Sequence, residues 1–436
     1  MKISGLHSNS LHPPALSAAD DAAVAGEEKL PYILLELEAY VADCVNATTA
    51  SCTTCDGKRV QVTLCPRRPP RVSYVCVHSP NAAEVNMEPN VLATDGDLLL
   101  LRLTVAAIGR RIDDNTDYYI YRAGAGGGAE GPSLILLPRP STGDFFNSWN
   151  IGILRYCPGG AGADDEAYVL AGLNERRRWR RPDGELDLSL YDSEQGLWKT
   201  VEASLKNKEL RQLQHGGEDF CHENSKVIAV GGDAGTVAFV DLWRGIIFCD
   251  VLPVLKDDDV TPTLRYVKLP RPLRRRNRDR ERGSDPRLYR DIAVVGDRIR
   301  YVEMQAHYTE STFFCNKFVT DGWMAITWSM PACVDSPPPE GWQLHSKVMN
   351  SRTLKVDQGN TSAALVTDKF CQPVLSLGDG VDVIYFTTKW SRRDADGWVV
   401  SVDLEKKELL DEASFVSQRN VGINLAYIHS RISSYL

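Results

Sequence analysis

Apolar and polar residues along the chain follow the pattern of short β-strands. Runs rich in β-branched and aromatic residues are bounded by Gly, Pro, Asn and Asp, which is typical of strands. Clear examples are 71–78, 97–105, 117–123 and 133–138. Helical periodicity is rare, and the best helix candidate is the short segment 203–214. The pattern therefore predicts an all-β protein with few helices.

Several of these strands recur as hairpins built to one plan, a strand, a polar turn and a second strand. The hairpins are predicted at 187–201, 236–252, 397–410, 117–137 and 322–348, the last two with longer turns. In the first three, an aspartate follows the first strand: Asp192, Asp241 and Asp403. The first two aspartates are 49 residues apart, which indicates a structural repeat.

A second recurring element precedes three of the hairpins. It is an apolar strand, a glycine near an aspartate, and a return strand, at 226–235, 291–300 and 373–382. An inner hairpin followed by an outer hairpin, recurring at about fifty residues or more, is the plan of a propeller blade. The fold predicted is a β-propeller-like array of four-stranded blades, and the alternative is a large irregular β-sandwich. The repeats are too degenerate to give the number of blades.

Tryptophans lie near the turns of three predicted outer hairpins. They are Trp198, Trp243 and Trp398. In a propeller, one face of each blade packs against the next blade. We therefore expect all three indoles to be largely buried.

The chain is expected to have a disordered leader at 1–29 and a single propeller-like domain at 30–436. The leader is rich in Ser, Ala and Pro and has no apolar core of the length that a signal peptide requires. Loop insertions are predicted at 123–131, 159–165, 271–287 and 331–341.

Composition narrows the class of protein. The 436 residues include 50 Lys+Arg and 58 Asp+Glu, for a net charge of −8, with 43% hydrophobic residues. These values are those of a globular protein, and an acidic chain is not built as a whole to bind nucleic acid. No run approaches the roughly 20 apolar residues of a membrane-spanning helix. Eleven cysteines without an export signal predict reduced thiols in the cytoplasm or the nucleus.

Segments spread over most of the chain resemble one plant family. The most specific is YVADCVNATTASC…DGKRVQVTLCPRRPPRVSYVCVH, within 40–78, and LRYVKLPRP, YRDIAVVGDRIRYVEM and the terminal SRISSYL are also similar. They resemble domain of unknown function 1618 (DUF1618), a family expanded in grasses, in order over 30–436. The resemblance implies a plant protein related to F-box-associated and kelch-like propeller domains. It implies no catalytic residue.

The cysteines suggest one candidate metal site. Cys52 and Cys55 have the spacing of half a zinc site, which Cys44 and Cys65 could complete. Only one tight pair is present, however, and a turn that carries two thiols explains it. A redox CxxC pair would require a following helix, whereas a strand follows here. The sequence therefore predicts no metal ligand and no cofactor.

Other motifs carry no catalytic assignment. The glycines at 124–131 lead into a strand and lack the lysine of a phosphate-binding loop. The segment 215–223 contains two histidines without the HExxH spacing, and no GxSxG motif is present. We nominate no catalytic residue and expect that the protein is not an enzyme.

Two arginine clusters, 175–181 and 271–287, allow three interpretations. They could be nuclear import signals, nucleic-acid contacts or solvated loops. The second cluster also contains acidic residues and few aromatic side chains accompany either, which argues against nucleic-acid binding.

The predicted fold supports two hypotheses about function. The first is a protein–protein interaction module that presents loops on a rigid scaffold to an unknown partner. The second is an enzyme or small-ligand-binding protein that uses the central channel. A convergent group of His, Asp or Glu on the inner strands would favour the second. The inner segments VIAVGG, IAVVG and VLSLG show apolar residues and glycines instead, which favours the first.

Overall fold

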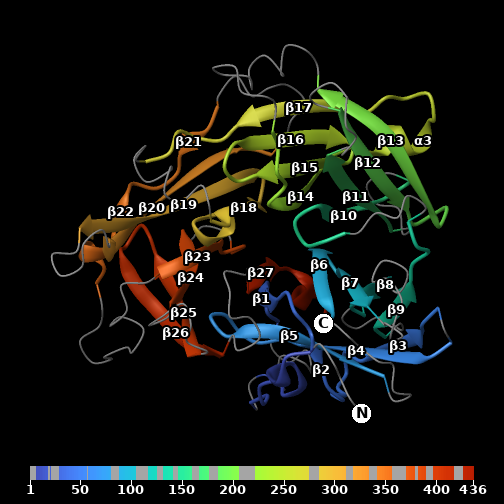
Figure 1. The fold of residues 1–436 in the computed structure, drawn as a ribbon, viewed down its shortest axis with the longest axis horizontal. Helices are drawn as coiled ribbons and strands as arrows, with labels where there is room; N and C mark the ends of the chain where they lie inside the picture. Colours follow the sequence, from blue (N-terminus) through green and yellow to red (C-terminus); the bar gives the residue numbers. More distant parts are fainter. Residues whose placement is uncertain are drawn as a thin grey trace.

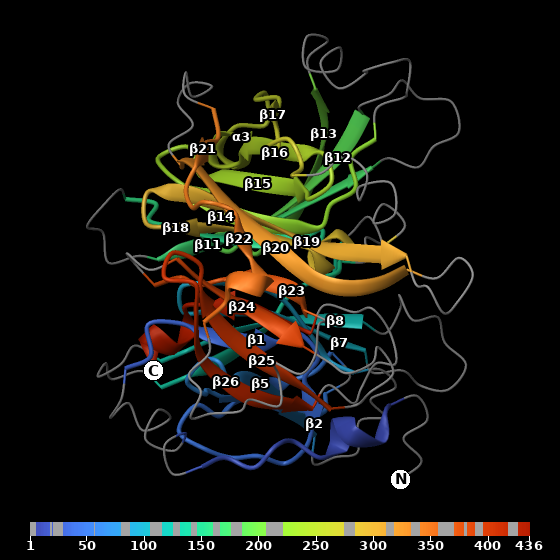
Figure 2. The same ribbon diagram turned by 90° about the vertical axis from the view of Figure 1, so that its left-hand side faces the viewer.

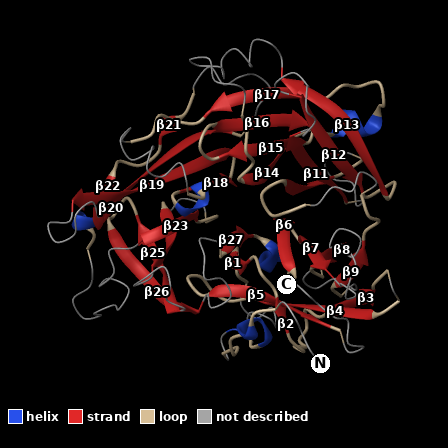
Figure 3. Cartoon of the chain, viewed as in Figure 1, coloured by secondary structure: helices blue, strands red, loops and turns tan. Residues whose placement is uncertain are grey.

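A computed structural model describes most of the chain. The described residues are 6–17, 20, 29–55, 57–79, 88–104, 116–124, 131–140, 146–159, 166–175, 185–205, 221–273, 284–310, 318–332, 341–355, 370–378, 382–388, 396–416 and 426–436. In these ranges almost all regular structure is β, as Figure 3 shows, with one short α-helix, α3 (Leu252–Lys256). The predicted all-β class is confirmed.

The described strands form six units arranged around a common centre (Figure 1). The first unit contains β1 (Ile33–Glu36), β2 (Tyr40–Val41), β3 (Ala50–Thr53), β4 (Arg59–Cys65), β5 (Val72–His78) and β27 (Tyr427–Ser430). The second contains β6 (Asn90–Asp95), β7 (Leu98–Thr104), β8 (Thr116–Arg122) and β9 (Ser133–Leu136). The third contains β10 (Ile151–Tyr156), β11 (Ala167–Glu175), β12 (Glu185–Asp192) and β13 (Leu197–Leu205).

Three further units complete the ring. The fourth contains β14 (Lys226–Gly231), β15 (Thr236–Asp241), β16 (Gly245–Asp250) and β17 (Thr263–Lys268). The fifth contains β18 (Arg290–Val295), β19 (Arg298–Glu310), β20 (Phe318–Pro331), β21 (Gln343–Leu344) and β22 (Met349–Asn350). The sixth contains β23 (Phe370–Leu375), β24 (Val383–Thr388), β25 (Asp396–Asp403) and β26 (Glu408–Val416). Figure 2 shows the long strands β19 and β20 facing the viewer.

The two ends of the chain meet in the first unit. Strand β27, near the C-terminus, pairs antiparallel with β1, with Ile33 opposite Ser430 and Glu36 opposite Tyr427. The third and fourth units are also joined, through a short parallel contact between β13 and β17. The sequence left open how the ring closes, and the structure closes it by pairing the first strand with the last.

Apolar side chains fill the spaces between neighbouring units all around the ring. Strand β7 shows why its sequence is a leucine run: Leu99 and Leu101 pack toward the first unit, while Leu98 and Leu100 pack toward the third. A strand buried on both faces reads as a continuous apolar run rather than an alternating one. Six such clusters, one between each pair of neighbours, hold the described units together as a propeller-like array.

The recurring aspartates are turn residues. The Asp241 carboxylate accepts hydrogen bonds from the backbone N–H groups of Trp243 and Arg244, at 2.8 and 3.1 Å. Asp403 accepts from two N–H groups of its turn in the same way, and Asp192 accepts from one. A short carboxylate side chain that accepts from the backbone two residues onward stabilises such turns. The repeat in the sequence therefore reflects hairpin geometry.

Some expectations need correction. Residues 203–205 of the expected helix are the end of β13, and the rest of it lies outside the described residues. Residues 6–17 of the expected disordered leader pack on the first unit, where the Ser10 hydroxyl donates to Glu88 and Pro14 accepts from the Tyr74 hydroxyl at 2.6 Å. These hydrogen bonds fix a segment that has little apolar content.

The three hairpin tryptophans are partly buried, and each packs against one of the apolar clusters between units. Trp198 stacks on Phe146, with ring centroids 5.4 Å apart, and its Nε1–H donates to the Pro138 carbonyl. The deeply buried tryptophan is Trp323, which is 2% exposed.

The predicted insertions overlap the parts of the chain that are not described. Residues 125–130, 160–165, 274–283 and 333–340 lie outside the described ranges. The end of the third insertion belongs to the fold, because Arg287 is half-buried in the 3-10 helix η3 (Pro286–Leu288) and pairs with Asp285 at 2.5 Å. Within the described ranges, no helix is long and apolar enough to cross a membrane.

Candidate functional site

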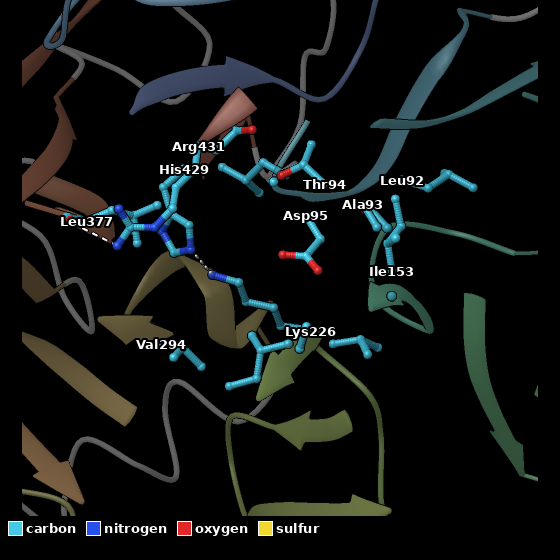
Figure 4. Close-up of a pocket in the computed structure, with 18 residues that line it drawn as sticks. Leu92, Ala93, Thr94, Asp95, Ile153, Lys226, Val294, Leu377, His429 and Arg431 are labelled. Carbon is cyan, nitrogen blue, oxygen red and sulfur yellow. Dashed lines mark hydrogen bonds between the residues drawn. The ribbon is translucent and has the colours of Figure 1, made fainter. Parts of the chain in front are cut away.

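A cavity of about 220 Å³ lies at the centre of the ring. The innermost strands of five units line it: β6, β10, β14, β18 and β27 (Figure 4). A buried water needs only about 10–15 Å³ of such volume, so the cavity could hold several waters or one small ligand. Its position on the axis of the ring makes it the channel expected of a propeller-like fold.

Three ionisable side chains meet beside this cavity; Lys226 and His429 line it, and Asp291 contacts both of them. The Lys226 Nζ lies 2.7 Å from the Asp291 Oδ1 and 3.5 Å from the His429 Nε2. The His429 Nδ1 lies 3.7 Å from the Asp291 Oδ2. The side chains are only 16%, 10% and 12% exposed, respectively. We call Lys226, Asp291 and His429 the channel triad.

Three different units supply the channel triad. Lys226 is the first residue of β14, Asp291 is the second residue of β18, and His429 lies in the closing strand β27. The N–H of Leu375, at the end of β23, donates to Asp291 Oδ2 at 3.0 Å and fixes the carboxylate. The triad thus depends on the assembly of four units of the ring.

Burial controls the charge of the triad. Burial first, and the nearby Lys226 ammonium second, lower the pKa of His429 to about 3 although Asp291 acts in the opposite direction, since a positive charge disfavours a second one. His429 is therefore neutral at physiological pH. Because an ammonium only donates, the Nε2 of His429 accepts from Lys226, and the ring proton resides on Nδ1, facing Asp291.

Two further charged residues line the same cavity. Asp95 ends β6, and Figure 4 shows its carboxylate pointing into the cavity shared with Lys226. Burial raises the pKa of Asp95, although the N–H of Arg155 donates to it at 2.8 Å. Arg431 also lines the cavity, and its guanidinium donates to the Leu377 carbonyl at 3.0 Å. The cavity is thus lined by the cations Lys226 and Arg431 and by a carboxyl group whose pKa is raised.

Sequence reasoning missed this site for an identifiable reason. The apolar cores of the inner segments, VIAVGG and IAVVG, indicate buried strands, and the charged residues Lys226 and Asp291 stand immediately before those cores. The sequence does contain a signal for this site, because a charged residue stands near the start of each of two corresponding inner strands. The convergent group that would favour a channel function is present in the structure.

The cysteines that the sequence considered together are separated in the structure. Cys52 lies in β3, and the exposed Cys55 donates to Asp117 Oδ2 at 3.2 Å. Cys44 and Cys65 lie together elsewhere, with their sulfur atoms 3.8 Å apart and Cys76 beside them. The four residues of the considered zinc site therefore do not converge.

The other motifs do not gather either. His222 is buried, and its Nε2 hydrogen-bonds to Asn224 Oδ1 at 3.0 Å. The N–H of the neighbouring Glu223 donates to the turn residue Asp241. His215, the glycines 125–130 and the arginines of 176–181 lie outside the described residues.

Comparisons with known proteins identify one sequence family. Residues 239–385 match the profile of a family described as "Protein of unknown function (DUF1618)", which confirms the expected resemblance. The matched region runs from β15 to β24 and includes Asp291 of the channel triad. No curated protein matches the chain.

Two solved structures show a distant likeness. A hypothetical selenium-binding protein from Sulfolobus tokodaii has 13% identity and a TM-score of 0.28, covering 83% of this chain and 74% of that one. The β-propeller domain of the Trilobed protease from Pyrococcus furiosus has 11% identity and a TM-score of 0.26, covering 75% and 96%. Similarities at such low identity and TM-score do not establish a shared fold or a shared function. The propeller-like assignment rests on the arrangement of the six units.

Proposed function

We propose from the geometry that the protein is a non-enzymatic binding protein that holds a small anion in its central channel. Residues 239–385 match the DUF1618 family model, and the function of that family is unknown. The observation that carries the proposal is the channel triad, Lys226, Asp291 and His429, beside a cavity of about 220 Å³. The ligand class is a small carboxylate or phosphate.

The cost of burying the triad supports a functional role. Removing charged groups from water is expensive even when they are paired, and well-packed apolar residues often stabilise a core as well or better. The rest of each inner strand is largely apolar or glycine, as in the IAVV that follows Asp291. Perturbed ionisable groups in a cavity are typical of functional sites. The triad is therefore better explained by ligand binding than by stability.

The balance of charge supports an anion. Lys226 and Arg431 are cations, whereas Asp291 is engaged with Lys226 and the pKa of Asp95 is raised by burial. An ammonium has three N–H donors, and two of those of Lys226 point at Asp291 and His429, which leaves a third. Charge-assisted hydrogen bonds from lysine and arginine are the usual contacts to carboxylates and phosphates.

The same geometry argues against acid–base catalysis. A general base works best when its pKa lies near the working pH. Burial and Lys226 place the pKa of His429 near 3, so this imidazole is a weak proton acceptor at pH 7. The triad is thus suited to hold a charged ligand rather than to move protons.

Thermal unfolding with defined anions tests the proposal. The probes are inorganic phosphate, citrate and oxalate, with chloride at matched ionic strength as the reference. A ligand at 100 times its Kd stabilises the native state by about 2.7 kcal/mol, which gives a measurable rise in Tm. We expect this rise in the wild type and in Lys355→Met, an exposed lysine, but not in Lys226→Met or Arg431→Gln. Equal responses in all four proteins, or no response to any probe, would refute it.

A second candidate function is binding of a protein partner, and one surface pair favours it. Trp149 precedes β10 and is 40% exposed, and the Arg287 guanidinium lies over its ring at 5.4 Å. Its neighbour Ser148 lines the cavity, so the pair lies close to the channel. Tryptophan and arginine are the side chains most enriched at the energetic centres of protein interfaces. We propose that this pair is the centre of a partner-binding surface.

A quantitative pull-down from the tissue that expresses the chain tests this second candidate. Proteins retained by the wild type are compared with those retained by Trp149→Ala and by Leu197→Ala, a control at a residue of the outermost strand β13 that is 63% exposed. A partner that is lost with Trp149→Ala and retained with Leu197→Ala supports the surface. Partners that the two variants retain equally would count against it.

A further inference from the structure

Three cysteine side chains converge in the first unit, and none of them belongs to the channel triad. They are Cys44, Cys65 and Cys76, and their sulfur atoms all lie within 4.8 Å of one another. The Cys44 and Cys65 sulfur atoms are 3.8 Å apart. Among the described residues, this is the one group of at least three possible metal ligands at such distances. We call it the thiol cluster.

The backbone fixes all three thiols. Cys65 ends β4, and Cys76 lies in the adjacent strand β5, where it faces Thr63. Cys44 lies in the loop after β2, and its carbonyl accepts from the Thr63 hydroxyl at 2.6 Å. The Asn46 amide ties the same loop to the Leu64 carbonyl at 3.1 Å. The three thiols therefore converge through strand pairing and loop anchoring.

The separations match those of metal thiolates. Zinc–sulfur bonds of 2.3 Å at tetrahedral angles place two sulfur atoms about 3.8 Å apart. The Cys44–Cys65 separation has this value, and Cys76 needs only a small movement of its side chain to join them. Cys65 and Cys76 are buried, whereas Cys44 is half-buried, so an ion would enter from the side of Cys44.

The surroundings favour a negatively charged sulfur at Cys65. Its hydrogen bond with the Cys76 thiol lowers the pKa of Cys65, and the Arg67 guanidinium lowers it further despite burial. Arg67 lies over the ring of Tyr74, with 5.4 Å between its central carbon and the ring centroid. By contrast, burial raises the pKa of Cys44 to about 11, so this thiol requires a metal to lose its proton at pH 7.

We propose that Cys44, Cys65 and Cys76 bind one thiophilic metal ion, either Zn²⁺ or Cu⁺. Soft thiolate ligands select these ions. Each thiol that is still protonated releases its proton to solvent as its sulfur–metal bond forms, with no change in oxidation state. Cu⁺ would be held by the three sulfur atoms alone, whereas Zn²⁺ would take a fourth ligand, such as water, on the side of Cys44. The site is independent of the channel function.

The experiment measures metal bound per chain. The full-length protein is reduced, stripped of metal with a chelator, and loaded anaerobically with Zn²⁺ alone or Cu⁺ alone. Excess metal is then removed, and the number of metal ions that remain bound per chain is measured by mass spectrometry. We expect one ion per chain in the wild type and in the double variant Cys52→Ser/Cys55→Ser, and loss of that ion in Cys44→Ala and Cys76→Ala. Binding of only one of the two metals identifies the ion.

Two further readouts keep the test decisive. Cys44 is half-buried in a loop, so Cys44→Ala should fold normally even if Cys76→Ala does not, and circular dichroism checks this. Bound metal should also protect Cys44, Cys65 and Cys76 from alkylation and leave Cys55 reactive. Equal metal content in folded Cys44→Ala and wild type, or no retained ion with either metal, overturns the proposal.

Discussion

The clearest consequence of the channel geometry is a loss of stability in mild acid through His429. Its neighbours are Lys226 from β14, Asp291 from β18 and Arg431 after β27, and the side chain is 12% exposed. Burial first, and Lys226 second, lower the pKa of His429 from 6.5 to about 3. The unfolded chain therefore binds a proton at this residue that the native state excludes. Stability then falls as the pH drops below about 6.5.

The size of this loss follows from the two pKa values. With a pKa of about 3 in the native state and 6.5 in the unfolded chain, lowering the pH from 7 to 5 removes about 2 kcal/mol of stability. The assay is urea unfolding at both pH values for the wild type and His429→Gln. Glutamine keeps an acceptor for Lys226 and cannot titrate, so carboxyl groups elsewhere contribute equally to both proteins.

The result to look for is the difference between the two proteins. The wild type should lose about 2 kcal/mol more than His429→Gln between pH 7 and pH 5. Losses that agree within about 0.5 kcal/mol would show that His429 titrates normally and that the triad is open to solvent. A larger loss in the variant would mean that the sign of the argument is wrong.

Three further predictions concern the fold and the arginine-rich stretch. Trp323 is 2% exposed and packs on two phenylalanine rings, so Trp323→Ala should cost about 3–5 kcal/mol in chemical denaturation. Gly152→Ala should cost about 1–3 kcal/mol, because its Cβ would lie 2.6 Å from a stiff methyl group of Val227, whereas Gly131→Ala, with open space around it, should be neutral. Replacing 274–282 with a short Gly/Ser turn should leave Tm nearly unchanged. In fluorescence microscopy, the same change moves the tagged protein out of the nucleus only if the stretch is an import signal.

The sequence predicted strands and hairpins well because their causes are local. Strand β7 is a leucine run since both of its faces are buried, and the turn aspartates recur since each accepts a hydrogen bond from the backbone N–H two residues onward. Both features can be read within a window of about ten residues. The all-β class and the propeller-like plan follow from them.

The channel triad could not be read in this way because its members are distant in sequence. Lys226, Asp291 and His429 lie in three units, and only the assembled ring places them within 4 Å of one another. Nothing in the local sequence of His429 distinguishes it from a histidine on an outer strand. Its position follows from the pairing of β27 with β1, nearly four hundred residues away.

The thiol cluster shows the same limit in another form. Close spacing drew attention to Cys52 and Cys55, but short spacing constrains only residues within one turn or hairpin. The thiols that meet come from a loop and from two paired strands, and Cys76 lies in an apolar run that looked like ordinary core. The pairing register between β4 and β5 decides which cysteines are neighbours, and this register cannot be read from the sequence.

Ring closure and the channel site depend on the same strand. Strand β27 closes the first unit by pairing with β1, and it also supplies His429, with Arg431 following directly. The channel therefore acquires a member of its triad and one of its cations only when the end of the chain is docked. A ligand that contacts Arg431 and Lys226 would bind the closed ring better than an open one, so it would stabilise closure by mass action. Binding in the channel and the integrity of the ring are then one coupled equilibrium.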